Sequence, residues 1–168
     1  MTYNEFTVQK TGQWRTFMKT EVHDKTIRNV RFYDHAEDSL LKFAVIISKS
    51  NDKWVYCRHR ARNTYEIPGG HREAGETILE TAKRELYEET GAVQYSLTPV
   101  CVYSVTREWE NQKEESYGML YYAEITEFEK ELHSEIEQIE FFNTIPEALT
   151  YPEIQPYLLE EAQRRGFC

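Results

Sequence analysis

The stretch that decides the fold runs from Gly70 to Ala92 and reads GHREAGETILETAKRELYEETGA. Its second half carries the start and stop signals of a helix. Thr77 is followed three residues later by Glu80, the spacing of a capping box, in which each side chain satisfies a backbone N–H of the first turn. Gly91 is a typical residue for the left-handed end of a helix. The sequence therefore predicts a helix over residues 78–90.

One face of this helix is apolar. Ile78, Ala82 and Leu86 recur every four residues, with Leu79 beside them. Residues at this spacing lie along one side of a helix and face a core. The helix is therefore expected to pack on another layer of the fold.

The same helix has an acidic edge. Glu85, Glu88 and Glu89 are three and four residues apart or adjacent, so their side chains are neighbours. At roughly 6 Å and an effective dielectric of about 20, each like-charged pair costs on the order of 3 kcal/mol. If this edge lines a cleft, the carboxylates must bind a divalent cation or become protonated, and oxygen ligands alone suit Mg²⁺ or Mn²⁺.

Taken alone, these features have simpler explanations. Three glutamates on a helix more often form a solvated face, and Arg84, four residues after Glu80, fits a surface ion pair. What reverses this interpretation is their register against the glycines upstream. Gly69, Gly70 and Gly75 allow backbone to approach a ligand or metal without interference from a Cβ atom.

Together the residues form a long motif: Gly70, five residues, Glu76, seven residues, and then RELYEETGA over 84–92. The motif resembles the Nudix box, G-x5-E-x7-R-E-U-x-E-E-x-G-U with U aliphatic, and every fixed position matches. Ala92 is smaller than the aliphatic residue usual at the last position. So many fixed positions at fixed spacing make this a specific signal, although it covers a small part of the chain.

The resemblance implies an α/β/α sandwich with a mixed sheet and hydrolysis of a nucleoside diphosphate linked to another group. It implies that Glu85 and Glu89 are the principal ligands of Mg²⁺ or Mn²⁺, and that Glu88 assists them or binds a second cation. The carbonyl of Gly70 would complete the site. By the same resemblance Arg84 orients Glu85, and Glu76 pairs with Arg84.

Relatives often supply a further catalytic glutamate from a loop well after the box. In this chain the segment before the expected strand 139–142 offers Glu135 as the first choice and Glu137 as the second.

The sequence favours one substrate class among those that Nudix enzymes cleave. The proline that ADP-ribose-cleaving relatives tend to carry beyond the box is missing from residues 105–108, which favours a MutT-like enzyme. Such an enzyme cleaves a nucleoside triphosphate, with a normal or oxidised base as in 8-oxo-dGTP, to the monophosphate and pyrophosphate. The alternatives are a nucleotide-sugar or dinucleoside polyphosphate hydrolase, and a nucleotide-sensing module without turnover, against which the intact glutamates argue.

The whole chain, residues 1–168, fits one domain without repeats or linkers. Apart from a strand at 26–33, the first forty residues carry weak signals. A hairpin is expected from 41–47 and 53–58 around the loop 48–52, and shorter strands at 65–67, 100–105, 119–125 and 139–142, with a break at Pro68–Gly70. A final helix from Pro152 to Arg165 should turn inward the side chains of Ile154, Tyr157, Leu158 and Ala162. This order predicts a mixed α/β sheet covered by helices.

Charge and composition limit the partners. The chain has 20 basic and 29 acidic residues, a formal net charge of −9, which disfavours duplex nucleic acid and anionic membranes. No apolar run is long enough for a membrane span, and three widely spaced cysteines indicate reduced thiols. We expect a cytoplasmic protein with a nucleotide substrate, and a homodimer is compatible with the sequence.

Basic residues before the box are candidates for phosphate contact. Arg58, Arg60 and Arg62 are either ordinary surface charges or, in a chain this acidic, phosphate ligands. We expect Arg58 and Arg60, together with the backbone of Gly69 and Gly70, to bind the substrate.

Overall fold

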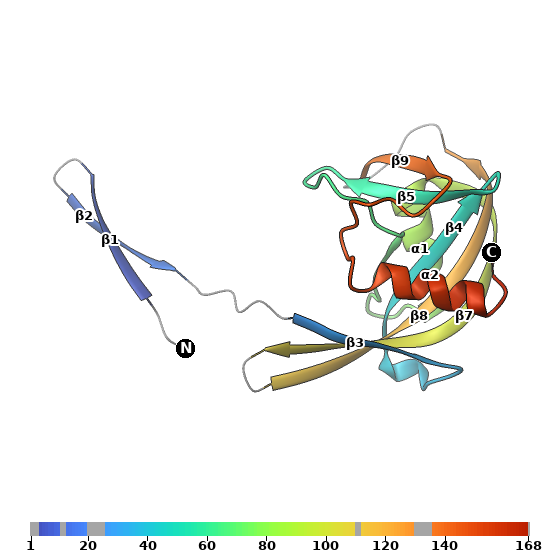
Figure 1. Ribbon diagram of the computed structural model, residues 1–168, viewed down its shortest axis with the longest axis horizontal. Coiled ribbons are helices and arrows are strands. Elements are labelled where there is room, and N and C mark those ends of the chain that lie inside the picture. The colour runs from blue at the N-terminus through green and yellow to red at the C-terminus, as the bar shows by residue number, and fades with distance from the viewer. Residues whose placement is uncertain (1–3, 11–12, 20–25, 110–111, 130–135, 168) are drawn as a thin grey trace.

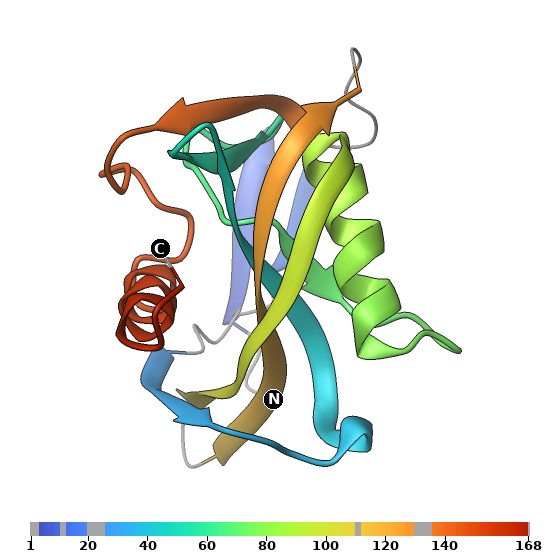
Figure 2. The ribbon, with the colours of Figure 1, turned by 90° about the vertical axis from the view of Figure 1, so that its right-hand side faces the viewer.

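The computed structural model describes residues 4–10, 13–19, 26–109, 112–129 and 136–167. A seven-stranded sheet forms the middle layer, in the order β3-β7-β8-β4-β5-β9, with the short strand β6 paired to β4. Figure 2 shows this sheet between α1, in green, and α2, in red. Among the described strands of this sheet, β4 and β8 pair in parallel and the other pairs are antiparallel. The predicted α/β/α sandwich with a mixed sheet is thus confirmed.

Figure 1 shows the elements coloured from the N-terminus to the C-terminus. The strands are β1 (Asn4–Lys10), β2 (Gln13–Lys19), β3 (Thr26–Tyr33), β4 (Leu41–Ser50), β5 (Lys53–His59), β6 (Gly69–His71), β7 (Ala92–Trp109), β8 (Gln112–Phe128) and β9 (Ile136–Phe142). The helices are the 3-10 turn η1 (Asp38–Leu40), α1 (Ile78–Thr90) and α2 (Gln155–Arg164). β1 and β2, which the sequence did not predict, pair with each other as a separate two-stranded antiparallel sheet.

The β4–β5 hairpin shows how local chemistry sets the fold. Ser50 pairs with Lys53, so the turn consists of Asn51 and Asp52 alone. Both have positive φ, 50° and 63°. This conformation matches the twist of paired strands and is one that asparagine and aspartate tolerate. The hairpin is confirmed, with a shorter turn than predicted.

Helix α1 has the predicted bounds and ends. Thr77 accepts a hydrogen bond from the N–H of Glu80, the Glu80 carboxylate accepts one from the N–H of Thr77, and Gly91 is left-handed with φ 71°. The side chains of Ile78, Ala82 and Leu86 are buried against the sheet. Leu79, however, is 42% exposed, so its place in the core stripe was wrong. It lies about 100° around the helix from Ile78, which turns it to the solvent.

Helix α2 covers the opposite face with a slightly different register from the predicted one. Ile154, Leu158 and Ala162 are buried as expected, but Tyr157 is 53% exposed and Leu159 is buried in its place. The helix begins at Gln155, not near Pro152. The inner face therefore centres on residues 158, 159 and 162, and Tyr157 lies outside it.

Two predictions around the Gly-rich turn were reversed. Residues 65–67 form no strand: Tyr65 and Glu66 make isolated bridges to Leu149 and Cys57. Gly69–His71, expected to interrupt regular structure, is strand β6 and pairs with residues 43–45 of β4. The strands predicted at 100–105 and 119–125 are parts of the longer β7 and β8.

No helix in the described part of the chain is long and apolar enough to cross a membrane.

Candidate active site

The acidic edge of α1 lies against β6. Glu85 is only 9% exposed. The Oε2 atom of Glu89 accepts a hydrogen bond from the N–H of Gly69 at 2.8 Å and lies 3.6 Å from the Sγ atom of Cys57. Glu85 and Glu89 are therefore packed against protein, whereas the side chain of Glu88 is 42% exposed.

Arg84 connects this edge to the loop before the helix. Its Nε and Nη2 atoms donate to the two carboxylate oxygens of Glu76 at 2.7 and 3.1 Å. Nη1 donates to Glu85 at 2.7 Å and to Glu88 at 3.2 Å, and Nη2 also donates to the carbonyl of His71 at 3.0 Å. Arg84 thus holds the loop and the carboxylates in place relative to each other. Its carboxylate partners are Glu76, Glu85 and Glu88, and not Glu80 as in the alternative of a surface ion pair.

Burial and pairing move the carboxyl pKa values in opposite directions. Hydrogen bonds from Arg84 lower the pKa of Glu76 to about 2. Burial raises the pKa of Glu85, against the effect of Arg84. Burial also raises the pKa of Glu89 to about 8, and the charge of Glu85 adds to the rise, while the Gly69 N–H opposes it. Glu85 and Glu89 are therefore neighbouring, poorly solvated acids, the case in which the sequence analysis expects a bound cation or protonation.

Gly70 has no room for a side chain. A Cβ atom at this position would lie 2.1 Å from Oε1 of Glu85. Only glycine lets the β6 backbone approach the carboxylate this closely.

The donor set fits a hard divalent cation. Glu85, Glu88, Glu89 and the Gly70 carbonyl offer oxygen atoms alone, which Mg²⁺ and Mn²⁺ prefer. Among the described residues, no three acidic, histidine or cysteine side chains already form a shell around one point. Glu85 and Glu88 turn to Arg84, and Glu89 turns to Gly69.

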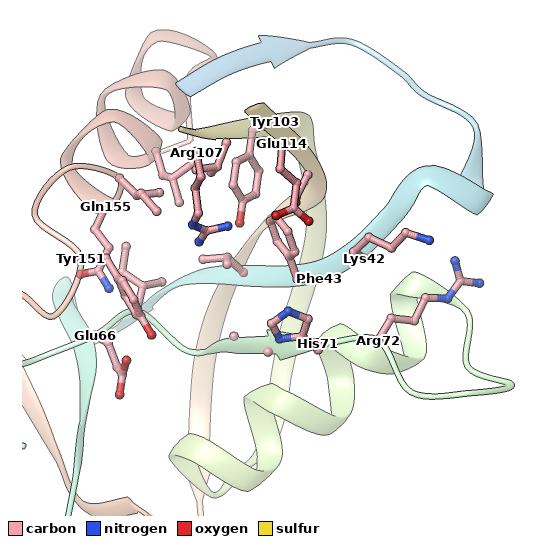
Figure 3. Close-up of a pocket in the computed structure, with 18 residues that line it drawn as sticks. Lys42, Phe43, Glu66, His71, Arg72, Tyr103, Arg107, Glu114, Tyr151 and Gln155 are labelled. Carbon is pink, nitrogen blue, oxygen red and sulfur yellow. The ribbon is translucent and has the colours of Figure 1, made fainter. Parts of the chain in front are cut away.

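A cavity of about 730 Å³ opens on the other side of β6. Gly69 and Gly70 line it, so β6 separates the acidic edge of α1 from the cavity (Figure 3). Aromatic and basic side chains make up much of the remaining wall: Phe43, Tyr103, Tyr151, Lys42, Arg72 and Arg107.

The other predicted residues lie outside this cavity wall or outside the described residues. Arg58 is partly buried on β5 and Arg60 is exposed in the turn that follows, and neither lines the cavity. Glu135 lies outside the described residues, and of Glu137 only the backbone, in β9, is described.

The comparison with known proteins decides the family. The family model of the NUDIX domain matches residues 39–162, most of the chain. The chain belongs to the Nudix hydrolase family. It is 33% identical over 110 residues to the Bacillus subtilis (strain 168) protein named "Putative 8-oxo-dGTP diphosphatase YtkD", across 65% of this chain and 66% of that protein.

Solved structures of Nudix proteins share the fold. A variant of the Bacillus subtilis pyrophosphohydrolase BsRppH superposes with a TM-score of 0.67 at 25% identity, over 82% of this chain and 92% of that one. A UDP-X diphosphatase superposes with a TM-score of 0.61 at 18% identity, over 79% of this chain and 65% of that one. The second likeness concerns the fold alone.

Sequence reasoning missed the basic residues that line the cavity of this Nudix protein. A signal for Arg107 was present, because Tyr103, Val105 and Arg107 alternate along one strand and so share a face. Arg72 and Lys42 carried no such signal. Their place depends on the pairing of β6 with β4, which joins distant parts of the chain.

Proposed function

We propose that this Nudix protein hydrolyses a nucleoside triphosphate, with a normal or oxidised base, to the monophosphate and pyrophosphate. The observation that carries the proposal is the acidic edge of α1 beside a cavity large enough for a nucleoside, with two glycines as the shared wall. The relative named as an 8-oxo-dGTP diphosphatase supports this substrate class.

The cation site is assigned to Glu85, Glu88, Glu89 and the carbonyl of Gly70. A bound Mg²⁺ or Mn²⁺ supplies a more acidic water and offsets the negative charge that develops on the phosphate oxygens.

The protein's own contribution begins with alignment. Arg84, held by both oxygens of Glu76, fixes the carboxylate of Glu85 through a 2.7 Å hydrogen bond. The N–H of Gly69 fixes Glu89 in the same way. These hydrogen bonds hold the two carboxylates beside β6 and limit the positions they can take when a cation binds.

The remaining roles follow the sequence analysis. A carboxylate must accept the proton of the attacking water, and we assign this role to Glu135, with Glu137 as the second choice; Glu88 assists the metal ligands or binds a second cation. Arg58 and Arg60 are assigned to outer phosphate contacts, and the backbone of Gly69 and Gly70 to the inner ones.

A nucleotide screen with product identification tests the proposal. With Mg²⁺ or Mn²⁺, the wild-type protein should release pyrophosphate from at least one nucleoside triphosphate, and chelation of divalent ions should abolish the release. Glu85→Gln should lower kcat by about 100-fold or more. Glu80→Gln is the matched control, because Glu80 lies on the same helix, outside the acidic edge, and takes part in the capping box.

Two results would overturn the proposal. Release of a nucleoside monophosphate and a sugar phosphate from nucleotide sugars, without action on triphosphates, would favour the nucleotide-sugar hydrolase. Nucleotide binding without any product would favour the sensing module.

A further inference from the structure

Two polar side chains of the cavity wall have no part in the proposed hydrolysis. Gln155 is the first residue of α2, and Arg107 belongs to β7 on the facing sheet. Both line the cavity, on elements that come from different layers of the fold (Figure 3).

Gln155 is the more unusual of the two. The residue is 4% exposed, and its Oε1 atom is buried without a hydrogen-bond partner in the described part of the chain. A buried acceptor that lacks a partner is unfavourable because it has lost its hydrogen bonds to water. Native structures rarely keep such an atom unless a ligand or water satisfies it. At the wall of a cavity, a ligand is the natural partner.

Arg107 supplies a donor on the other wall. It lies on the same face of β7 as Tyr103 and Val105, and its guanidinium reaches into the cavity (Figure 3). A guanidinium donates hydrogen bonds in a planar fork and accepts none.

We infer that Arg107 and Gln155 read the base of the nucleotide and select guanine over adenine. This inference rests on the proposed function. The edge of guanine that carries O6 and N7 offers two acceptors, the pattern that arginine binds as a fork, whereas adenine presents an amino donor at position 6. The amide of Gln155 can accept from a ring N–H and donate to a carbonyl.

The rest of the cavity agrees with a base at this place. Phe43 and Tyr151 line it and offer aromatic surface against which a purine ring can pack. Gly69 and Gly70, on the wall shared with the acidic edge of α1, lie where the phosphates must leave the cavity.

The test compares the binding of dGMP and dAMP by calorimetry, which needs no turnover. The wild-type protein should bind dGMP about tenfold or more tightly than dAMP. Arg107→Gln and Gln155→Met should each lower this ratio to about twofold or less, mainly by weakening dGMP. Exposed residues of the same types serve as controls: Arg31→Gln on β3 and Gln163→Leu on α2 should keep the ratio.

Every outcome bears on the inference. Equal losses for dGMP and dAMP would mean that Arg107 binds the phosphate, and unchanged ratios would mean that neither side chain reads the base; both overturn it. If a variant does not fold, as judged by circular dichroism, Arg107→Lys and Gln155→Glu repeat the test with conserved shape. Pyrophosphate release from dGTP and dATP separately reports the proposed function, which can stand when the base preference fails.

Discussion

Gly70 and Glu85 lie in direct contact across the boundary between β6 and α1. A Cβ atom on Gly70 would lie 2.1 Å from Oε1 and 2.4 Å from Cδ of Glu85, well inside van der Waals distance. The position of β6 therefore limits where the Glu85 carboxylate can lie. In turn, the Glu85 side chain leaves room only for glycine at position 70 of β6.

Gly70→Ala is expected to lower kcat/KM by about 100-fold, because the added methyl group must displace the Glu85 carboxylate from the position set by Arg84. Pyrophosphate release under subsaturating substrate measures the effect. Gly166→Ala is the control: nothing lies within 4 Å of its added carbon, and its positive φ introduces backbone strain far from the site. Similar losses in both variants would mean that the effect does not depend on the contact with Glu85, and would contradict the contact argument.

Arg84→Lys should lower kcat/KM by roughly 10- to 100-fold while the protein stays folded. Lysine keeps the charge, but a single ammonium cannot bind Glu76, Glu85 and the His71 carbonyl in the planar fork that arginine forms. Steady-state kinetics and circular dichroism check the two halves of this expectation. Activity near the wild-type level would show that charge alone matters at this position.

Acid stability should depend on Glu161 of α2. Its carboxylate accepts hydrogen bonds from Arg164 at 2.6 and 2.7 Å and from Arg165 at 2.7 Å, and these bonds lower its pKa to about 2. The folded pKa lies below the unfolded value of 4.5, so this stabilisation is present above pH 4.5 and is lost as the pH falls toward 2.

Glu161→Gln should therefore reduce the free energy of unfolding at pH 7 by about 1–3 kcal/mol. The difference from the wild-type protein should shrink as the pH falls from 4.5 toward 2. Urea unfolding at pH 7, 4.5 and 3 measures it. Glu160→Gln, at the exposed neighbouring position, should change stability little at every pH. A difference between Glu161→Gln and wild type that is independent of pH would contradict the assignment.

The register of α2 is tested by two adjacent residues. Leu158→Ala should lower the free energy of unfolding by about 2–5 kcal/mol, because the side chain is 1% exposed in the core between α2 and the sheet. Tyr157→Ala should stay within about 0.5 kcal/mol of the wild-type value, as expected for an exposed side chain. A loss of about 2 kcal/mol or more for Tyr157→Ala would instead support the inner face predicted from the sequence, which includes both residues.

The features predicted correctly are those that depend on residues close together in the chain. Thr77, Glu80 and Gly91 determine both ends of α1 by contacts within one turn, so the helix and its acidic edge could be predicted from the sequence. Asn51 and Asp52 determine the β4–β5 turn in the same way.

The features that were missed depend on distant parts of the chain. β6 forms because β4 lies beside it, although its sequence, Gly-Gly-His, favours a break. Gln155 and Arg107 share a cavity because α2 packs on the face of the sheet to which β7 turns Arg107, and the local sequence does not indicate this packing. Tyr157 was placed on the inner face because the helix was expected to begin at Pro152. In the structure α2 begins at Gln155, and Tyr157 lies on the exposed side.

The parallel pairing of β4 with β8 affects how the protein folds during synthesis. Ile46 pairs with Tyr121, about 75 positions later, so the centre of the sheet cannot close until most of the chain has left the ribosome. Until then the apolar β4 has its hairpin partner but lacks a neighbour on its other side, and the nascent protein is most open to aggregation and to chaperones during this interval.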